Sequence, residues 1–135
     1  MKITICGSIK FYDDMLKVKA KLEELGHEVL MPTKAKGVDY WAKDNKARVE
    51  VKRRFEFVKK HLDKIEQSGA ILVVNATKND IKNYIGANTF LEMGYAYYRK
   101  KKIYTINPLP DQPYIIDELL TFGPIVLNGK LKLIK

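Results

Sequence analysis

Short apolar runs that favour β-strands alternate along the whole chain with longer segments whose apolar residues have helical spacing. Alternation of this kind predicts a parallel sheet with helices on both faces. The run at residues 70–75 is almost entirely apolar, which is typical of a strand buried on both sides. We therefore predict a single α/β domain over residues 1–135, a Rossmann-like or flavodoxin-like three-layer sandwich with a mostly parallel sheet of about five strands. Strands are expected at residues 2–6, 28–31, 70–75, 103–106 and 124–127, and helices at 11–25, 45–67, 88–99 and 114–120.

Composition narrows the environment of the chain. It is 46% hydrophobic and 30% charged, which is ordinary for a globular domain. No apolar run approaches the roughly 20 residues of a membrane-spanning helix, and the N-terminus is typical of a strand rather than a signal peptide. The single cysteine, Cys6, cannot form an intrachain disulfide. We expect a cytoplasmic protein that does not associate with membranes.

The net charge of +9 favours anionic partners. Many basic residues fall within residues 43–64, where the apolar positions form one helical face and leave the cations on the others, as on a solvated surface. No nucleic-acid-binding motif supports them, so nucleic acid is expected only as a minor alternative, bound through this helix. His27 and His61 are expected at the surface. With no other cysteine or histidine cluster, we expect no metal site.

The first expected strand runs into a turn that contains Gly7, Ser8 and Lys10. A glycine lets the backbone approach a ligand, and free amides at the start of the next helix favour an anion. A plain turn with Ser8 as helix N-cap explains the same residues. The turn is neither a dinucleotide-binding fingerprint nor a Walker A loop, which argues against NAD binding and ATP hydrolysis.

The segment at residues 86–96 carries one carboxylate, Glu92, near an expected helix start. Thr89 and Glu92 have the spacing of a capping box, in which Glu92 would reach back to the Thr89 amide. However, Asn88 is itself a good N-cap, and the polar stretch before it is long for a mere connection. Helix starts in a parallel sheet point to the edge where ligands bind. Glu92, expected in the first turn, is either a cap or a nucleophile.

Residues 6–10 and 88–96 resemble two motifs of the nucleoside 2-deoxyribosyltransferase superfamily, which includes the 2'-deoxynucleoside 5'-phosphate N-hydrolases. Gly-Ser-Ile-Lys at residues 7–10 is similar to the Gly-Ser-Ile-Arg turn of the N-hydrolases. Asn-Thr-Phe-Leu-Glu-Met-Gly-Tyr-Ala at residues 88–96 is similar to the Gly-Thr-x-x-Glu-x-Gly-x-Ala stretch of the transferases. The order and spacing of elements match over most of the length, but residues 31–69 show little similarity.

The resemblance implies cleavage or transfer at the N-glycosidic bond of a deoxynucleoside or its 5'-monophosphate, without a cofactor. The family glutamate that attacks the anomeric carbon corresponds to Glu92, whose ionised form the helix dipole would favour. An asparagine near the C-terminus of the transferases enters a neighbouring subunit's site. Asn128 is its counterpart, which implies a homo-oligomer. The substrate-binding residues would be Gly7, Ser8, Lys10, Asn88, Thr89 and Asn128.

Two family residues have no equivalent in this chain. A tyrosine common on the first strand corresponds to Thr4. The aspartate that the family places around its third strand, where it helps with proton handling, has only Gly69, Ala70 and Asn75 nearby, with Asp80 in a loop as a substitute. A second hypothesis is therefore a nucleotide-binding module on the same fold without catalysis.

Overall fold

The computed structural model describes residues 1–135 and contains one five-stranded sheet, in which every pair of neighbouring strands is parallel. The order β2-β1-β3-β4-β5 is the flavodoxin-like arrangement, which the sequence alone did not fix. The expected α/β fold is thus confirmed. The strands are β1 (Lys2–Cys6), β2 (Glu28–Leu30), β3 (Ala70–Val73), β4 (Lys102–Thr105) and β5 (Ile125–Val126).

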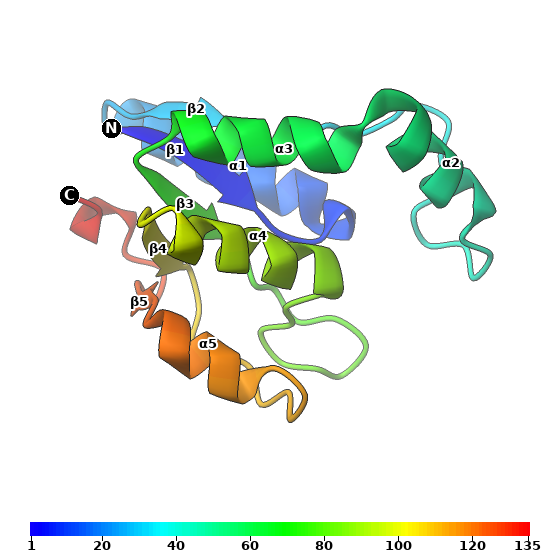
Figure 1. The fold of residues 1–135 in the computed structure, drawn as a ribbon. Coiled ribbons are helices and arrows are strands. Elements are labelled where there is room, and N and C mark those ends of the chain that lie inside the picture. The colour runs from blue at the N-terminus through cyan, green and yellow to red at the C-terminus, as the bar shows by residue number, and fades with distance from the viewer.

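The helices cover both faces of the sheet and make three layers (Figure 1). Successive side chains on a strand point to opposite faces, so Ile5 lies in the core under α1 and Cys6 in the core under α3 and α4. None of the helices is long and apolar enough to cross a membrane. The helices are α1 (Tyr12–Glu24), α2 (Lys46–Phe55), α3 (Phe57–Gln67), α4 (Ala87–Tyr98) and α5 (Ile116–Phe122), with short 3₁₀ turns η1 (Ile9–Phe11) and η2 (Leu131–Leu133).

The basic segment expected as one long helix forms two, α2 and α3, which is a correction. Glu56 between them has a left-handed backbone with φ of 51°. The rings of Phe55 and Phe57 stack across this break, with centroids 5.6 Å apart. Helix α3 buries His61 and Ile65, whereas α2 buries no residue and extends beyond the sheet (Figure 1). The break therefore lets α3 follow the sheet while α2 leaves it.

The neighbours β1 and β3 mark the point where the strand order reverses. The chain leaves β1 through α1 on one face and leaves β3 through α4 on the other. The two connections diverge and leave a crevice at the carboxyl ends of these strands, where α/β proteins bind ligands. The turn at residues 7–10 and the start of α4 both lie at this crevice.

Candidate functional site

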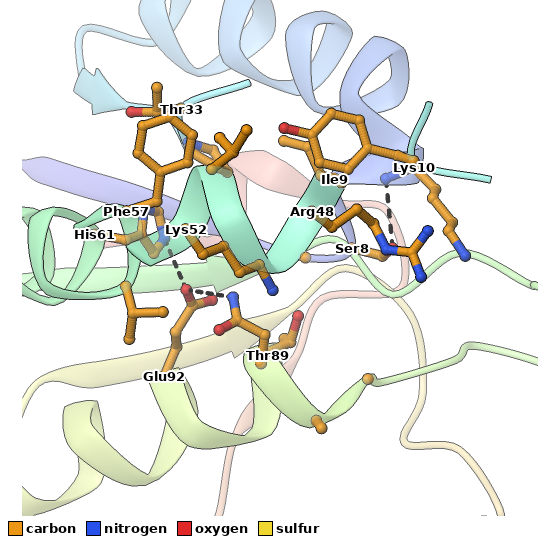
Figure 2. Close-up of a pocket in the computed structure, with 18 of the residues that line it drawn as sticks. Ser8, Ile9, Lys10, Thr33, Arg48, Lys52, Phe57, His61, Thr89 and Glu92 are labelled. Atoms are coloured by element: carbon orange, nitrogen blue, oxygen red, sulfur yellow. Dashed lines mark hydrogen bonds and ion pairs between the residues drawn. The ribbon is translucent and has the colours of Figure 1, made fainter. Parts of the chain in front are cut away.

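A pocket of about 230 Å³ opens at the crevice between β1 and β3 (Figure 2). Its volume is slightly below the range of roughly 300–1,000 Å³ that is typical of small-molecule sites. Six of the predicted site residues line this one pocket, although they come from two distant segments: Gly7, Ser8, Lys10, Asn88, Thr89 and Glu92.

Asn128, the seventh predicted residue, does not line the pocket. It lies in the turn after β5 with φ of 50°, and the amide of Gly129 beside it donates to the carbonyl of Ile106. This is a turn geometry that asparagine and glycine favour. A role for Asn128 in a neighbouring copy of the chain stays a prediction.

The start of α4 contradicts the capping-box interpretation. The helix begins at Ala87 with the extended Gly86 as its N-cap, so Asn88 and Thr89 lie within the first turn. Glu92 falls in the second turn rather than the first, and no side chain caps the helix. Instead, Asn88 Nδ2 donates to Glu92 Oε2 at 3.2 Å. Glu92 is 4% exposed and its carboxyl group is turned toward the pocket (Figure 2).

The buried side chains of Cys6, His61 and Glu92, which come from three different elements, meet at one side of the pocket. His61 Nε2 on α3 lies 3.5 Å from Glu92 Oε2 and 3.5 Å from Cys6 Sγ at the end of β1. Sequence reasoning placed His61 at the surface, which is wrong because the side chain is buried. It also did not foresee that Cys6, His61 and Glu92 would gather three potential metal-ligand atoms. One signal was available, because His61 shares the apolar helical face of Val58 and Ile65.

Burial decides the charge of this cluster. It raises the pKa of Glu92 to about 8, against the opposing effects of a hydrogen bond from Cys6 and the positive charge of Lys52. It also lowers the pKa of His61 to about 4, assisted by Lys64, and raises the pKa of the Cys6 thiol well above its usual range. The contact between His61 and Glu92 is therefore a contact of neutral groups near pH 7, not an ion pair. Removal from water outweighs the helix dipole that was expected to keep Glu92 ionised.

One end of the pocket is strongly cationic. Lys10, Arg48 and Lys78 line it together with Ser8. Burial, followed by the positive charges of Lys10 and Arg48, lowers the pKa of Lys78 to about 8. Glu92 is the only carboxylate among the lining residues, so these cations have no acidic partner in the pocket. Arg48 was not predicted as a site residue, because the cations of residues 43–64 were assigned to a solvated helix surface. Lys78, in the loop after β3, was not predicted either.

The other end of the pocket is largely apolar. Phe57, Val58 and Val51 line it near His61, and Tyr40 contributes a buried ring whose hydroxyl accepts a hydrogen bond from the amide of Ala35. Figure 2 shows Phe57 and His61 at one side of the site, Ser8, Arg48 and Lys10 at the other, and Glu92 below them. The pocket thus combines an apolar end, a buried acid and a cationic end.

The positions that differ from the family motifs have structural roles. Thr4 is buried, and its hydroxyl lies 2.7 Å from that of Ser68, away from the pocket. Asn75 is also buried outside the pocket, and its side chain hydrogen-bonds to Asn107 and Pro108 in the loop after β4. Asp80 is exposed and does not line the pocket. No second acid therefore joins Glu92 there.

Similarity to known proteins is found in the fold and not in the sequence. No family model matches the chain, and no curated protein matches it in sequence. Among solved structures, a 2-deoxyribosyltransferase from Bacillus psychrosaccharolyticus is 16% identical with a TM-score of 0.58, and the match covers 93% of this chain and 98% of that one. A CMP N-glycosidase from Clostridium botulinum is 16% identical with a TM-score of 0.53, covering 93% and 85%. The chain shares its fold with these two proteins, which is consistent with the resemblance of its motifs.

Proposed function

We propose that the protein cleaves or transfers the N-glycosidic bond of a deoxynucleoside 5'-monophosphate, with Glu92 as the nucleophile. One observation carries this proposal: a single buried carboxyl group lies between an apolar end and a cationic end of the same pocket. Two proteins of the same fold support it: one is a CMP N-glycosidase and the other a 2-deoxyribosyltransferase.

The charge distribution of the pocket suggests how such a substrate would bind. An aromatic base suits the apolar end with Phe57, and the phosphate group suits Lys10, Arg48 and Lys78. The deoxyribose between them would then lie against Glu92. Because three cations without an acidic partner favour a phosphate, we place the monophosphate ahead of the free nucleoside as substrate.

The chemistry requires the carboxylate of Glu92 to attack the anomeric carbon as the bond to the base breaks. The reaction passes through an oxocarbenium-like state, whose positive charge a carboxylate stabilises strongly in a buried site. The resulting glycosyl ester is released by water, which gives hydrolysis, or by a second base, which gives transfer. Glu92 must first lose its proton to solvent, and because its pKa is about 8, only a minority of the molecules carry the carboxylate near pH 7. Hydrolysis is preferred because the cationic end suits a phosphorylated substrate.

Release of free base, followed by chromatography, tests the proposal. Wild-type protein would be incubated with a panel of deoxynucleosides and their 5'-monophosphates, with and without an acceptor base. Glu92→Gln keeps the size of the side chain and should abolish release. Asp80→Asn, an exposed acid outside the pocket, should leave it unchanged. Absence of release by wild type from every member, or undiminished release by Glu92→Gln, would contradict the mechanism.

A nucleotide-binding module without catalysis is the second candidate. It is favoured by the raised pKa of Glu92, which leaves the acid protonated near pH 7, and by the lack of a second acid in the pocket. This candidate requires that a deoxynucleoside 5'-monophosphate raises the melting temperature of both wild type and Glu92→Gln, while neither releases base.

A further inference from the structure

Three potential metal-binding atoms converge at one side of the pocket: the sulfur of Cys6, Nε2 of His61 and a carboxylate oxygen of Glu92. All three lie within 4.8 Å of one another, and all three residues are buried. They come from β1, α3 and α4, which pack together around the core (Figure 1). A cluster held by three packed elements is already assembled before any ligand arrives, so little conformational entropy opposes binding.

The distances fit a tetrahedral zinc-like centre. Metal–ligand bonds of roughly 2.0–2.3 Å at tetrahedral angles place neighbouring donor atoms roughly 3.3–3.6 Å apart. His61 Nε2 lies 3.5 Å from Cys6 Sγ and 3.5 Å from Glu92 Oε2. Two of the three separations therefore already match, and the third, between sulfur and carboxylate, is within 4.8 Å.

The imidazole of His61 is also oriented as a ligand. Its Nδ1 is buried without a hydrogen bond, whereas Nε2 lies 3.5 Å from both Cys6 Sγ and Glu92 Oε2. With the proton on Nδ1, the lone pair of Nε2 is directed at Cys6 and Glu92, as a shared metal ion requires.

We infer that Cys6, His61 and Glu92 form a binding site for one thiophilic divalent cation of the Zn²⁺ class. Sulfur, imidazole and carboxylate together are a donor set that Zn²⁺ accepts, and His61 and Glu92 line the pocket, which leaves a fourth position open to it. The cation replaces the thiol proton and the carboxyl proton, which leave as two H⁺. The complex is then uncharged overall, so Lys52 and Lys64 nearby do not oppose it as they would an unpaired cation.

Metal binding and the proposed nucleophile exclude each other, because both use the carboxylate of Glu92. The cation is therefore an inhibitor of the activity proposed above. This consequence rests on that proposed function, whereas the metal site itself does not.

A titration of the full, chelator-treated chain with Co²⁺ tests the site directly. One equivalent should produce a thiolate-to-cobalt charge-transfer band in the near ultraviolet and intense visible bands of tetrahedral cobalt, and Zn²⁺ should displace both. Cys6→Ala should remove the charge-transfer band. Glu92→Gln and His61→Gln should weaken Co²⁺ binding by at least about tenfold. His27→Gln is the matched control, because His27 lies far from the pocket at the other end of the sheet near Met1.

Circular dichroism of the metal-free variants shows whether each is folded. If a variant is not folded, the titration of the wild type still decides whether the site exists. No saturable spectrum with wild type, or an unchanged band in folded Cys6→Ala, would overturn the inference. Base release in the presence of a chelator and of Zn²⁺ is measured separately. If wild type releases no base at all, the proposed function fails, while the cobalt spectrum still decides the metal site.

Discussion

Asn75→Asp should destabilise the protein instead of restoring an active-site acid. This substitution places an aspartate at the end of the third strand, near where the resemblance expects one. In the structure, Asn75 Nδ2 donates to the carbonyl groups of Asn107 and Pro108, both at 3.0 Å, and its Oδ1 accepts from the Asn107 amide at 3.0 Å. The side chain is fully buried, so water cannot replace these partners.

The size of the effect follows from these hydrogen bonds. An aspartate at position 75 keeps the accepted bond but loses two donated bonds, at roughly 1 kcal/mol each. Its carboxylate would also lie against two carbonyl oxygens without water, which costs a further 1–3 kcal/mol, approximately. We therefore expect a loss of about 3–5 kcal/mol near pH 7, which corresponds to a fall in melting temperature of roughly 10–18 °C.

The loss should depend on pH. The folded protein would raise the pKa of the new carboxyl group above its unfolded value of about 3.9, because a protonated acid can donate to one carbonyl group. The deficit relative to wild type is then smallest near pH 4 and grows as the pH rises toward the folded-state pKa. Asn75→Ala loses all three hydrogen bonds of the side chain without adding a charge, so its deficit should not vary with pH.

Urea unfolding of the wild type and both variants at pH 4.5, 6 and 7.5 measures these free energies. An Asn75→Asp variant as stable as wild type at pH 7.5, or one whose deficit parallels that of Asn75→Ala at every pH, would contradict this prediction. A gain in base release by Asn75→Asp would show that this side chain reaches the substrate, in disagreement with its position outside the pocket.

Two other predictions concern the cationic end and the break between α2 and α3. Lys78 has a pKa lowered to about 8, so it is charged below that pH and neutral above it. The rise in melting temperature caused by inorganic phosphate should therefore be largest at pH 7–8 and shrink toward pH 10. Lys78→Gln should flatten this dependence. Glu56 has a left-handed backbone, which glycine adopts without strain. In urea unfolding, Glu56→Gly should therefore be more stable than Glu56→Ala by roughly 1 kcal/mol. Equal stability of the two variants would mean that the break stores no strain.

The fold was predictable because its signals are local. Apolar runs located the strands, helical spacing of apolar residues located helices, and the alternation of the two implied a parallel sheet. The break at Glu56 was not predictable, since residues 45–67 contain neither glycine nor proline and the apolar repeat continues across it. Only the packing of α3 on the sheet, with the stacked rings of Phe55 and Phe57, selects a left-handed residue there. Tertiary contacts of this kind leave no mark at one position of the sequence.

The site was predictable where it lies next to strand ends. Parallel strands bring their carboxyl ends to one edge, so the turn after β1 and the start of α4 were expected to meet. His61, Arg48 and Lys78 were missed because the break between α2 and α3 and the loop after β3 bring them to the pocket. The register of β1 then connects the two halves of the site. Cys6 faces α3 and α4 in the buried cluster, and the next residue, Gly7, turns the chain so that Ser8 and Lys10 lie at the cationic end.

Gly7 makes that change of direction possible at close quarters. A side-chain Cβ at this position would lie 3.0 Å from the carbonyl oxygen of Val74 on the neighbouring chain segment, which is closer than real Cβ atoms normally approach. The turn after β1 and the end of β3 are therefore held against each other by backbone contact, with the amide of Val74 donating to the carbonyl of Cys6 at 2.8 Å. The buried cluster and the cationic end consequently share one rigid support. A ligand that binds both ends meets a site already in place, and its binding energy is available for the reaction at Glu92 instead of being used to order the loops.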